Sequence, residues 1–79
     1  MDVSKVVEYC VARLVDDPES VVVDAKKDRG VIHVQVSVAP NDVGKVIGRN
    51  GRVINALRHV VSSVAAKTNH RAYVKILTP

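Results

Sequence analysis

Apolar residues recur along the chain first at helical spacing, then in alternation, and then at helical spacing again. From residue 3 to about 15, apolar positions three or four apart predict an amphipathic helix that Asp2 or Ser4 can cap. The helix is expected to end before Pro18, because the residue preceding a proline is pushed out of the helical region. The β-branched run Val21–Val23 then predicts a strand.

A second strand is predicted from Val31 to Val38, where apolar and polar residues alternate. Between the two strands, Lys26–Gly30 is expected to form the hairpin loop, with a glycine available for a left-handed conformation. The alternation leaves one face of the sheet in contact with water. The polar side chains expected on that face are His33, Gln35 and Ser37.

Two helices are predicted in the second half of the chain. Asn41 can cap a short helix from Asp42 to about Ile47. A longer helix is expected from about Arg52 to Lys67, ending near Asn69. The side chains that this helix is expected to bury are Ile54, Leu57, Val61 and Val64.

A third strand is predicted near the end of the chain, because Ala72, Val74 and Ile76 alternate with the residues between them. The resulting order is α-β-β-α-α-β, an α+β class in which three helices lie on one face of a three-stranded sheet. The two-helix connection between the second and third strands permits parallel pairing. With 79 residues, the chain is expected to form one domain over 1–79.

A Gly-x-x-Gly turn between the two later helices carries most of the functional information. Gly48 and Gly51 have no Cβ, so a phosphate can approach the main chain closely, and both can take positive φ. Arg49 and Asn50 lie between them and can form charge-assisted hydrogen bonds with phosphate oxygens. The neighbouring cations Lys45 and Arg52 add to the positive charge.

Charge is distributed unevenly along the chain, although the net charge is only +4. All eight acidic residues lie within the first 42 positions. The later basic residues therefore follow without an acid, which indicates a polyanionic partner near the glycine turn. They are Lys45, Arg49, Arg52, Arg58, Lys67, Arg71 and Lys75.

Other kinds of chemistry have little support in the sequence. No acid, base or nucleophile constellation indicates an enzyme, and the glycine run lacks the ending of a P-loop. The histidines are scattered and have no ligand spacing, so neither a metal nor a cofactor is expected. The single Cys10 and the lack of a signal peptide or membrane-spanning run predict a reducing cytoplasm. Aromatic residues are limited to Tyr9 and Tyr73, so base contacts are expected to be aliphatic or hydrogen-bonded.

The segment Val46–Ile54 resembles the signature of KH domains, in which Ile-Gly-x-x-Gly-x-x-Ile joins two helices. The element order is similar to the type II, prokaryotic arrangement. The whole length, together with Leu14–Pro18 after the first helix, resembles the small bacterial single-domain KH proteins of the KhpA type.

This resemblance implies binding of single-stranded RNA, with the glycine turn holding about four nucleotides against a groove. It assigns backbone contacts to Gly48, Arg49, Asn50 and Gly51, and it places Val46, Ile47 and Ile54 in or beneath the apolar groove. Lys45, Arg52 and Arg58 are added on electrostatic grounds. Proteins of this kind act as RNA chaperones or regulators and can pair with a larger KH protein of the KhpB type.

Two other functions remain open from the sequence. Two helices joined by a glycine-containing turn also fit a helix-turn-helix that binds DNA, although Val53, Ile54 and Leu57 are apolar where base-reading side chains are needed. The groove could instead receive a polypeptide, which would make the chain a protein-interaction or dimerisation module. The small size and apolar content also predict self-association, with a symmetric dimer as the favoured form.

Overall fold

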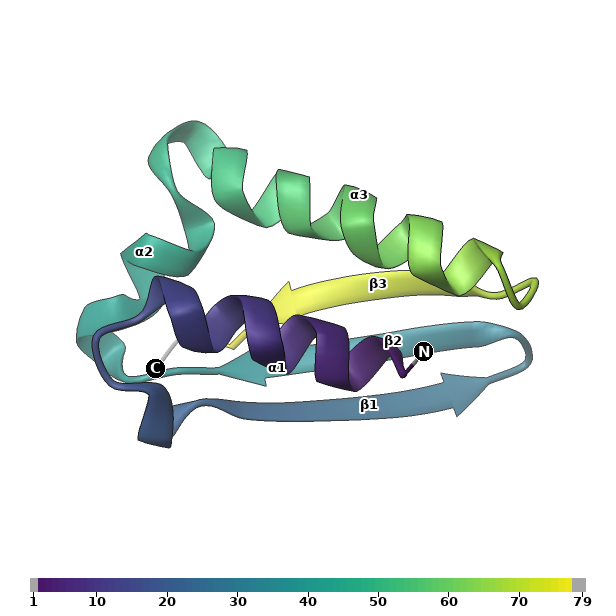
Figure 1. Ribbon diagram of the computed structural model, residues 1–79, viewed down its shortest axis with the longest axis horizontal. Helices are drawn as coiled ribbons and strands as arrows, with labels where there is room; N and C mark the ends of the chain where they lie inside the picture. Colours follow the sequence, from purple (N-terminus) through teal and green to yellow (C-terminus); the bar gives the residue numbers. More distant parts are fainter. Residues whose placement is uncertain (1, 78–79) are drawn as a thin grey trace.

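The computed structural model describes residues 2–77, and its elements follow the predicted order (Figure 1). Short 3₁₀ turns occupy several of the connections between them. The helices are α1 (Val3–Leu14), α2 (Val43–Ile47) and α3 (Arg52–Ala66), and the strands are β1 (Val22–Asp28), β2 (Val31–Ser37) and β3 (Arg71–Ile76). The predicted α+β class is confirmed.

The strands form one sheet in the order β1-β2-β3. β1 pairs with β2 in antiparallel fashion, and β3 returns to pair with β2 in parallel after the two-helix connection. Figure 1 shows α1 and α3 lying across one face of this sheet, with α2 at one end. β2 is therefore the central strand, and β3 is an edge strand beneath α3.

The first hairpin is tighter than the sequence predicts. β1 continues to Asp28, and only Arg29 and Gly30 form the turn, with φ values of 51° and 79°. Positive φ at both positions suits the right-handed twist of a two-residue hairpin. The prediction of a loop beginning at Lys26 is therefore wrong. Because most side chains of β1 are exposed, the strand lacks the apolar alternation that would have revealed its length.

Valine dominates the core between the helices and the sheet. The largest side chains that are fully buried are Val7, Val11, Val34, Val36, Val46 and Val61. On α3 the buried stripe runs through Ile54, Leu57, Val61 and Ala65. Val64, predicted to be buried, is half-buried and packs at the margin, because the stripe continues by four residues from Val61 to Ala65.

The helix ends show which capping predictions hold. Asp2 caps α1, since its Oδ1 accepts hydrogen bonds from the Ser4 backbone N–H at 3.0 Å and from the Ser4 hydroxyl at 2.8 Å. Asn69, with φ of 60°, follows α3 as predicted. The predicted cap by Asn41 is wrong. A 3₁₀ turn already starts at Pro40, whose fixed φ favours the first helical position, and Asn41 lies exposed inside that turn.

Candidate functional site

The Gly48–Gly51 turn connects α2 to α3 with an unusual backbone. Gly48, Asn50 and Gly51 have φ values of 77°, 56° and 73°. The turn is closed by its own main chain, because the Gly48 N–H donates to the Gly44 carbonyl at 2.8 Å and the Gly51 N–H donates to the Gly48 carbonyl at 3.1 Å. The turn thus has a defined shape without any help from its side chains.

The two glycines are needed for different reasons. A Cβ at Gly48 would lie 2.4 Å from Cγ2 of Val53, so a side chain there would collide with the first turn of α3. A Cβ at Gly51 would lie 3.7 Å from Nδ2 of Asn55, which is ordinary contact. Gly48 therefore meets both a steric and a conformational requirement, whereas Gly51 meets only a conformational one.

Arg49 and Asn50 form the exposed tip of the turn, and Arg52 is exposed at the start of α3. In Figure 1 the turn stands away from the sheet, at the end of the molecule where β3 also ends. Between residue 43 and residue 77 no acidic residue occurs. The tip consequently presents a cation, an amide and a close-approach backbone to solvent.

The apolar residues assigned to the groove occupy different depths. Val46 is fully buried and Ile54 is 5% exposed, so both belong to the core that holds α2 and α3 together. Ile47 is half-buried and packs against that core. Of these three residues, only Ile47 offers apolar surface beside the turn, and the other two support it from below.

The sequence predicted that no acid would oppose Lys45, and this prediction is wrong. Its Nζ lies 2.9 Å from Oδ2 of Asp16 and 3.1 Å from Oδ1 of Asp42. Hydrogen bonds to Asp16 and then to Asp42 raise the pKa of Lys45 above its ordinary value of 10.5. The ammonium group therefore ties α2 to the connection that follows α1, because Asp16 belongs to that connection.

Asp42 is the buried anchor of this contact, and sequence reasoning missed its role. The residue is 2% exposed, and its second oxygen, Oδ2, accepts a hydrogen bond from the Asp17 backbone N–H at 3.1 Å. Desolvation raises the pKa of Asp42. The hydrogen bonds from Lys45, Asp17 and Asp16 outweigh it, so that the pKa lies below 3.8. The signal available in the sequence was an acid three residues before a lysine.

We expect the Asp42→Asn variant to be less stable than the parent at neutral pH and to differ less from it at low pH. A carboxyl whose pKa is lowered by folding stabilises the protein above its unfolded pKa, and this contribution disappears as the pH falls through the folded value. The melting temperature of the parent should therefore exceed that of the variant at neutral pH, and the difference should narrow below about pH 4. Thermal melts monitored by circular dichroism across this range test the prediction.

Asp24→Asn is the control for this measurement, because Asp24 is an exposed carboxylate on β1. An equal narrowing in the control would attribute the effect to general charge rather than to the contact between Asp42 and Lys45. If the difference in melting temperature between the parent and Asp42→Asn does not change with pH, the proposed role of the Asp42 carboxylate is contradicted.

Arg58 links α3 to the free edge of β3. Its Nε donates to the Val74 carbonyl at 3.3 Å, and its Nη1 donates to Oδ1 of Asn55, also at 3.3 Å. The same Asn55 has its Nδ2 near Gly51. Asn55 thus lies between the turn and Arg58. It was not among the site residues predicted from the sequence.

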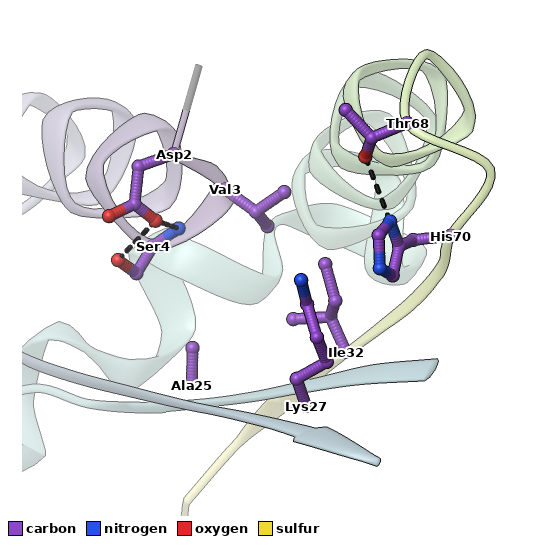
Figure 2. Close-up of a pocket in the computed structure, with 8 residues that line it drawn as sticks. All are labelled: Asp2, Val3, Ser4, Ala25, Lys27, Ile32, Thr68 and His70. Atoms are coloured by element: carbon purple, nitrogen blue, oxygen red, sulfur yellow. Dashed lines mark hydrogen bonds between the residues drawn. The ribbon is translucent and has the colours of Figure 1, made fainter. Parts of the chain in front are cut away.

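A cavity of about 450 Å³ lies near the start of α1 (Figure 2), and the start of α1 is at the end of the molecule opposite the turn (Figure 1). Several of its polar groups already have partners: Asp2 caps α1, and Thr68 Oγ1 lies 2.9 Å from His70 Nδ1. It does not touch the glycine turn. Its lining residues are Asp2, Val3, Ser4, Ala25, Lys27, Ile32, Thr68 and His70.

Within residues 2–77, no group of three or more His, Cys, Asp and Glu side chains is placed to hold a metal ion. None of the helices that the structure describes has the length and apolar character needed to cross a membrane.

The order α-β-β-α-α-β, with a Gly-x-x-Gly turn between α2 and α3, defines a KH domain of the type II arrangement. Residues 4–76 match the family described as "KhpA/KhpB, KH domain". The chain belongs to this family, which is a non-enzymatic class.

Curated relatives agree with this assignment. The "RNA-binding protein KhpA" of Oceanobacillus iheyensis is 41% identical over 71 residues, covering 90% of this chain and 95% of the relative. The protein of the same description from Halalkalibacterium halodurans is 42% identical over 71 residues, covering 90% and 93%. The one from Chlamydia trachomatis is 38% identical over 69 residues, covering 87% and 88%. The similarity therefore extends over nearly the whole of each chain.

Proposed function

We propose that this chain is a single KH domain that binds single-stranded RNA through the Gly48–Gly51 turn, acting in the cytoplasm as an RNA chaperone or post-transcriptional regulator. The observation that carries the proposal is the exposed tip of Arg49 and Asn50 on a turn whose backbone is open to close approach. The curated relatives are described as RNA-binding proteins, which supports the same ligand.

The surrounding residues have distinct roles in this proposal. Arg49, Asn50 and the two glycines contact the phosphate backbone, and Arg52 extends the positive surface along α3. Arg58 marks the far side of the groove, at the edge of β3. Lys45 contributes chiefly by holding α2 in place through its carboxylate partners. Val46 and Ile54 support the groove from the core, and Ile47 contributes surface.

Duplex DNA binding in the manner of a helix-turn-helix is the weaker alternative. A recognition helix needs polar side chains at its start that reach base edges in the major groove. Here α3 begins with Arg52, and Ile54 and Leu57 are both buried in the core. Because Arg52 and Asn55 still face outward there, the choice of RNA rests on the Gly48–Gly51 turn and on the RNA-binding description of the relatives.

Competition binding tests the choice of ligand. A labelled single-stranded RNA should be displaced by unlabelled RNA of the same sequence and much less by duplex DNA of equal length. Affinity should fall with salt along a log-log slope of about 2 to 3, because each phosphate neutralised on a single strand contributes roughly 0.7. Preferential displacement by duplex DNA would contradict the proposal. So would tight binding to one RNA motif that is insensitive to salt.

We further propose that the chain forms a symmetric dimer through α3, and that the same surface can receive a larger KH protein of the KhpB type. Val60 is 48% exposed on α3, and Ala56 is exposed one turn before it. Val53 and Val64 are half-buried on either side, which completes an apolar stripe at helical spacing. A stripe of this kind favours packing against a second helix.

Sedimentation at micromolar concentration should show a species heavier than 8.6 kDa for the parent and a monomer for Val60→Asp. Ser62→Asp is the matched control, because two residues of helix place the same charge on the opposite flank of α3. A parent that remains monomeric would contradict self-association without affecting the RNA-binding proposal.

A further inference from the structure

We propose that the sheet face turned away from the helices is a second contact surface for single-stranded RNA, on which Tyr73 and His33 stack bases. The identity of the ligand rests on the RNA-binding function proposed above. The surface itself is separate from the glycine turn and is carried by different observations.

The outward residues of β2 and β3 meet side by side on this face. His33 is paired with Tyr73 in the parallel register, and Gln35 is paired with Lys75. All four side chains are exposed, whereas Val34 and Val74 between them are buried on the helix side. The alternation thus produces an open polar face beside a closed apolar one.

Tyr73 and His33 form a stacked pair on that open face. Their ring centroids are 5.9 Å apart and their planes differ by 21°, and Tyr73 is 55% exposed. Bases of single-stranded RNA stack on exposed aromatic rings, and sheet faces that carry such rings are an established way of binding them. The low aromatic content predicted base contacts without rings, but the strand register concentrates one tyrosine and one histidine at a single place.

Positive charge flanks the rings. Arg71 and Lys75 precede and follow Tyr73 on β3, each about 6.6 Å along the strand. Lys26 on β1 is paired with His33 from the other side. The acids of this face, Asp24 and Asp28, are confined to β1, which lies about 9.6 Å from β3 across the sheet. The half of the face built from β2 and β3 is therefore basic and aromatic.

The edge of β3 lies between this surface and the side of the molecule that carries α3 and the glycine turn (Figure 1). The Val74 carbonyl on the free edge of β3 accepts the hydrogen bond from Arg58, and β3 ends at the same end of the molecule as the turn (Figure 1). A strand of RNA that leaves the turn past Arg58 can cross this edge and reach Tyr73. An RNA longer than the roughly four nucleotides held by a KH turn would thus contact both places.

The observations favour RNA over a protein partner on this face. The central part of a protein interface is depleted of charged residues and rich in apolar contact. Here the exposed aromatic ring of Tyr73 lies between two cations, and the exposed Val22 lies across the sheet on β1. Isolated rings among cations match bases and phosphates better than they match an apolar surface.

Tyrosine fluorescence gives a direct readout of base stacking. The chain has no tryptophan and two tyrosines, so the Tyr9→Phe variant leaves Tyr73 as the only strong fluorophore. An oligouridylate of about 12 nucleotides should quench this fluorescence, whereas one of about 4 nucleotides should bind the turn without quenching. Unchanged fluorescence with saturating longer RNA would overturn the proposal.

Binding affinity gives a second, independent readout. Tyr73→Ala should weaken binding of the longer oligouridylate by about tenfold and leave binding of the shorter one unchanged. Tyr9→Ala is the matched control, because it removes the other exposed tyrosine, which stacks against Arg13 on α1. Equal affinities of parent and Tyr73→Ala for the longer RNA would overturn the proposal. The proposal would also be overturned if Tyr73→Ala left the RNA affinity unchanged and altered the sedimentation of the protein. That result would assign the face to a protein partner.

The two RNA proposals fail in distinguishable ways. If the turn is not a binding site, the Arg49→Asp, Asn50→Asp double variant will still bind the longer RNA, and that RNA will still quench the fluorescence of Tyr73. This result would support binding at the sheet face and contradict binding at the turn. If the sheet face is not a binding site, the short and long RNAs will both depend on the turn and neither will respond to Tyr73→Ala. Circular dichroism confirms that each variant is folded.

Discussion

Replacing Arg49 and Asn50 together by Asp is expected to lower the affinity for short single-stranded RNA by about a hundredfold or more, because two carboxylates would face the phosphates. The domain should stay folded, with a change in unfolding free energy within about 0.5 kcal/mol, since both side chains are exposed. Asp also tolerates the positive φ of residue 50. Fluorescence anisotropy with an RNA of about four nucleotides and thermal melts measure the two effects.

The matched control for this variant is Lys5→Asp combined with Asn69→Asp. It makes the same change in net charge, and Asn69 shares the left-handed backbone of Asn50, with φ of 60°. Its two sites lie on α1 and after α3, away from the turn. Equal loss in both double variants would show that only overall charge matters. A folded Arg49→Asp, Asn50→Asp protein that binds RNA as tightly as the parent would refute the assigned site.

Gly48→Ala is expected to remove a large share of the stability of this small domain, by about 3 kcal/mol. Its Cβ would lie 2.4 Å from Val53 Cγ2 and 2.9 Å from the Val53 backbone nitrogen, so α3 would have to shift. The backbone at φ 77° and ψ 170° is also one that side chains avoid. A single small domain has a few kcal/mol to lose, so the melting temperature should fall sharply and binding should fall with it.

The other glycines of the region calibrate this result. Gly51→Ala should cost about 1 kcal/mol, because its Cβ would make only ordinary contacts and the change brings only the penalty of a left-handed residue. Gly44→Ala meets nothing within 4 Å in the helical α2 and should be neutral or stabilising by up to about 1 kcal/mol. Denaturant unfolding of all three variants tests the order. A Gly48→Ala variant as stable as Gly51→Ala would contradict the steric role of Val53.

The helices and strands could be predicted from the sequence where buried residues recur at regular spacing. α1, β2, α3 and β3 each place apolar residues on one face, and the sequence shows that spacing directly. β1 shows it only at its start, because Asp24–Asp28 lies on an exposed edge strand where apolar side chains have nothing to pack against. β1 ends at the two-residue turn of Arg29 and Gly30, in which both residues have positive φ. The glycine in the sequence indicates positive φ at only one of these two positions.

The candidate site was predictable in its centre and not at its margins. The glycine turn is a local feature, so its residues could be named from the motif alone. The pairing of Lys45 with Asp16 could not, because Asp16 precedes it by almost thirty positions and a charge count along the chain does not show which residues meet in space. Composition likewise gave no sign that Tyr73 lies beside His33, because strand register decides that pairing.

The parallel pairing of β2 with β3 gives the glycine turn a place in the folding pathway. Everything between Ser37 and Arg71, including α2, the turn and α3, must be folded back before these strands can meet. Closing so long a connection costs chain entropy that the β1–β2 hairpin does not incur, so the hairpin can form early and the third strand late. Partly folded chains that lack β3 would have neither the edge contacted by Arg58 nor Tyr73 in position. RNA bound as proposed above would therefore stabilise only molecules in which β3 is paired with β2.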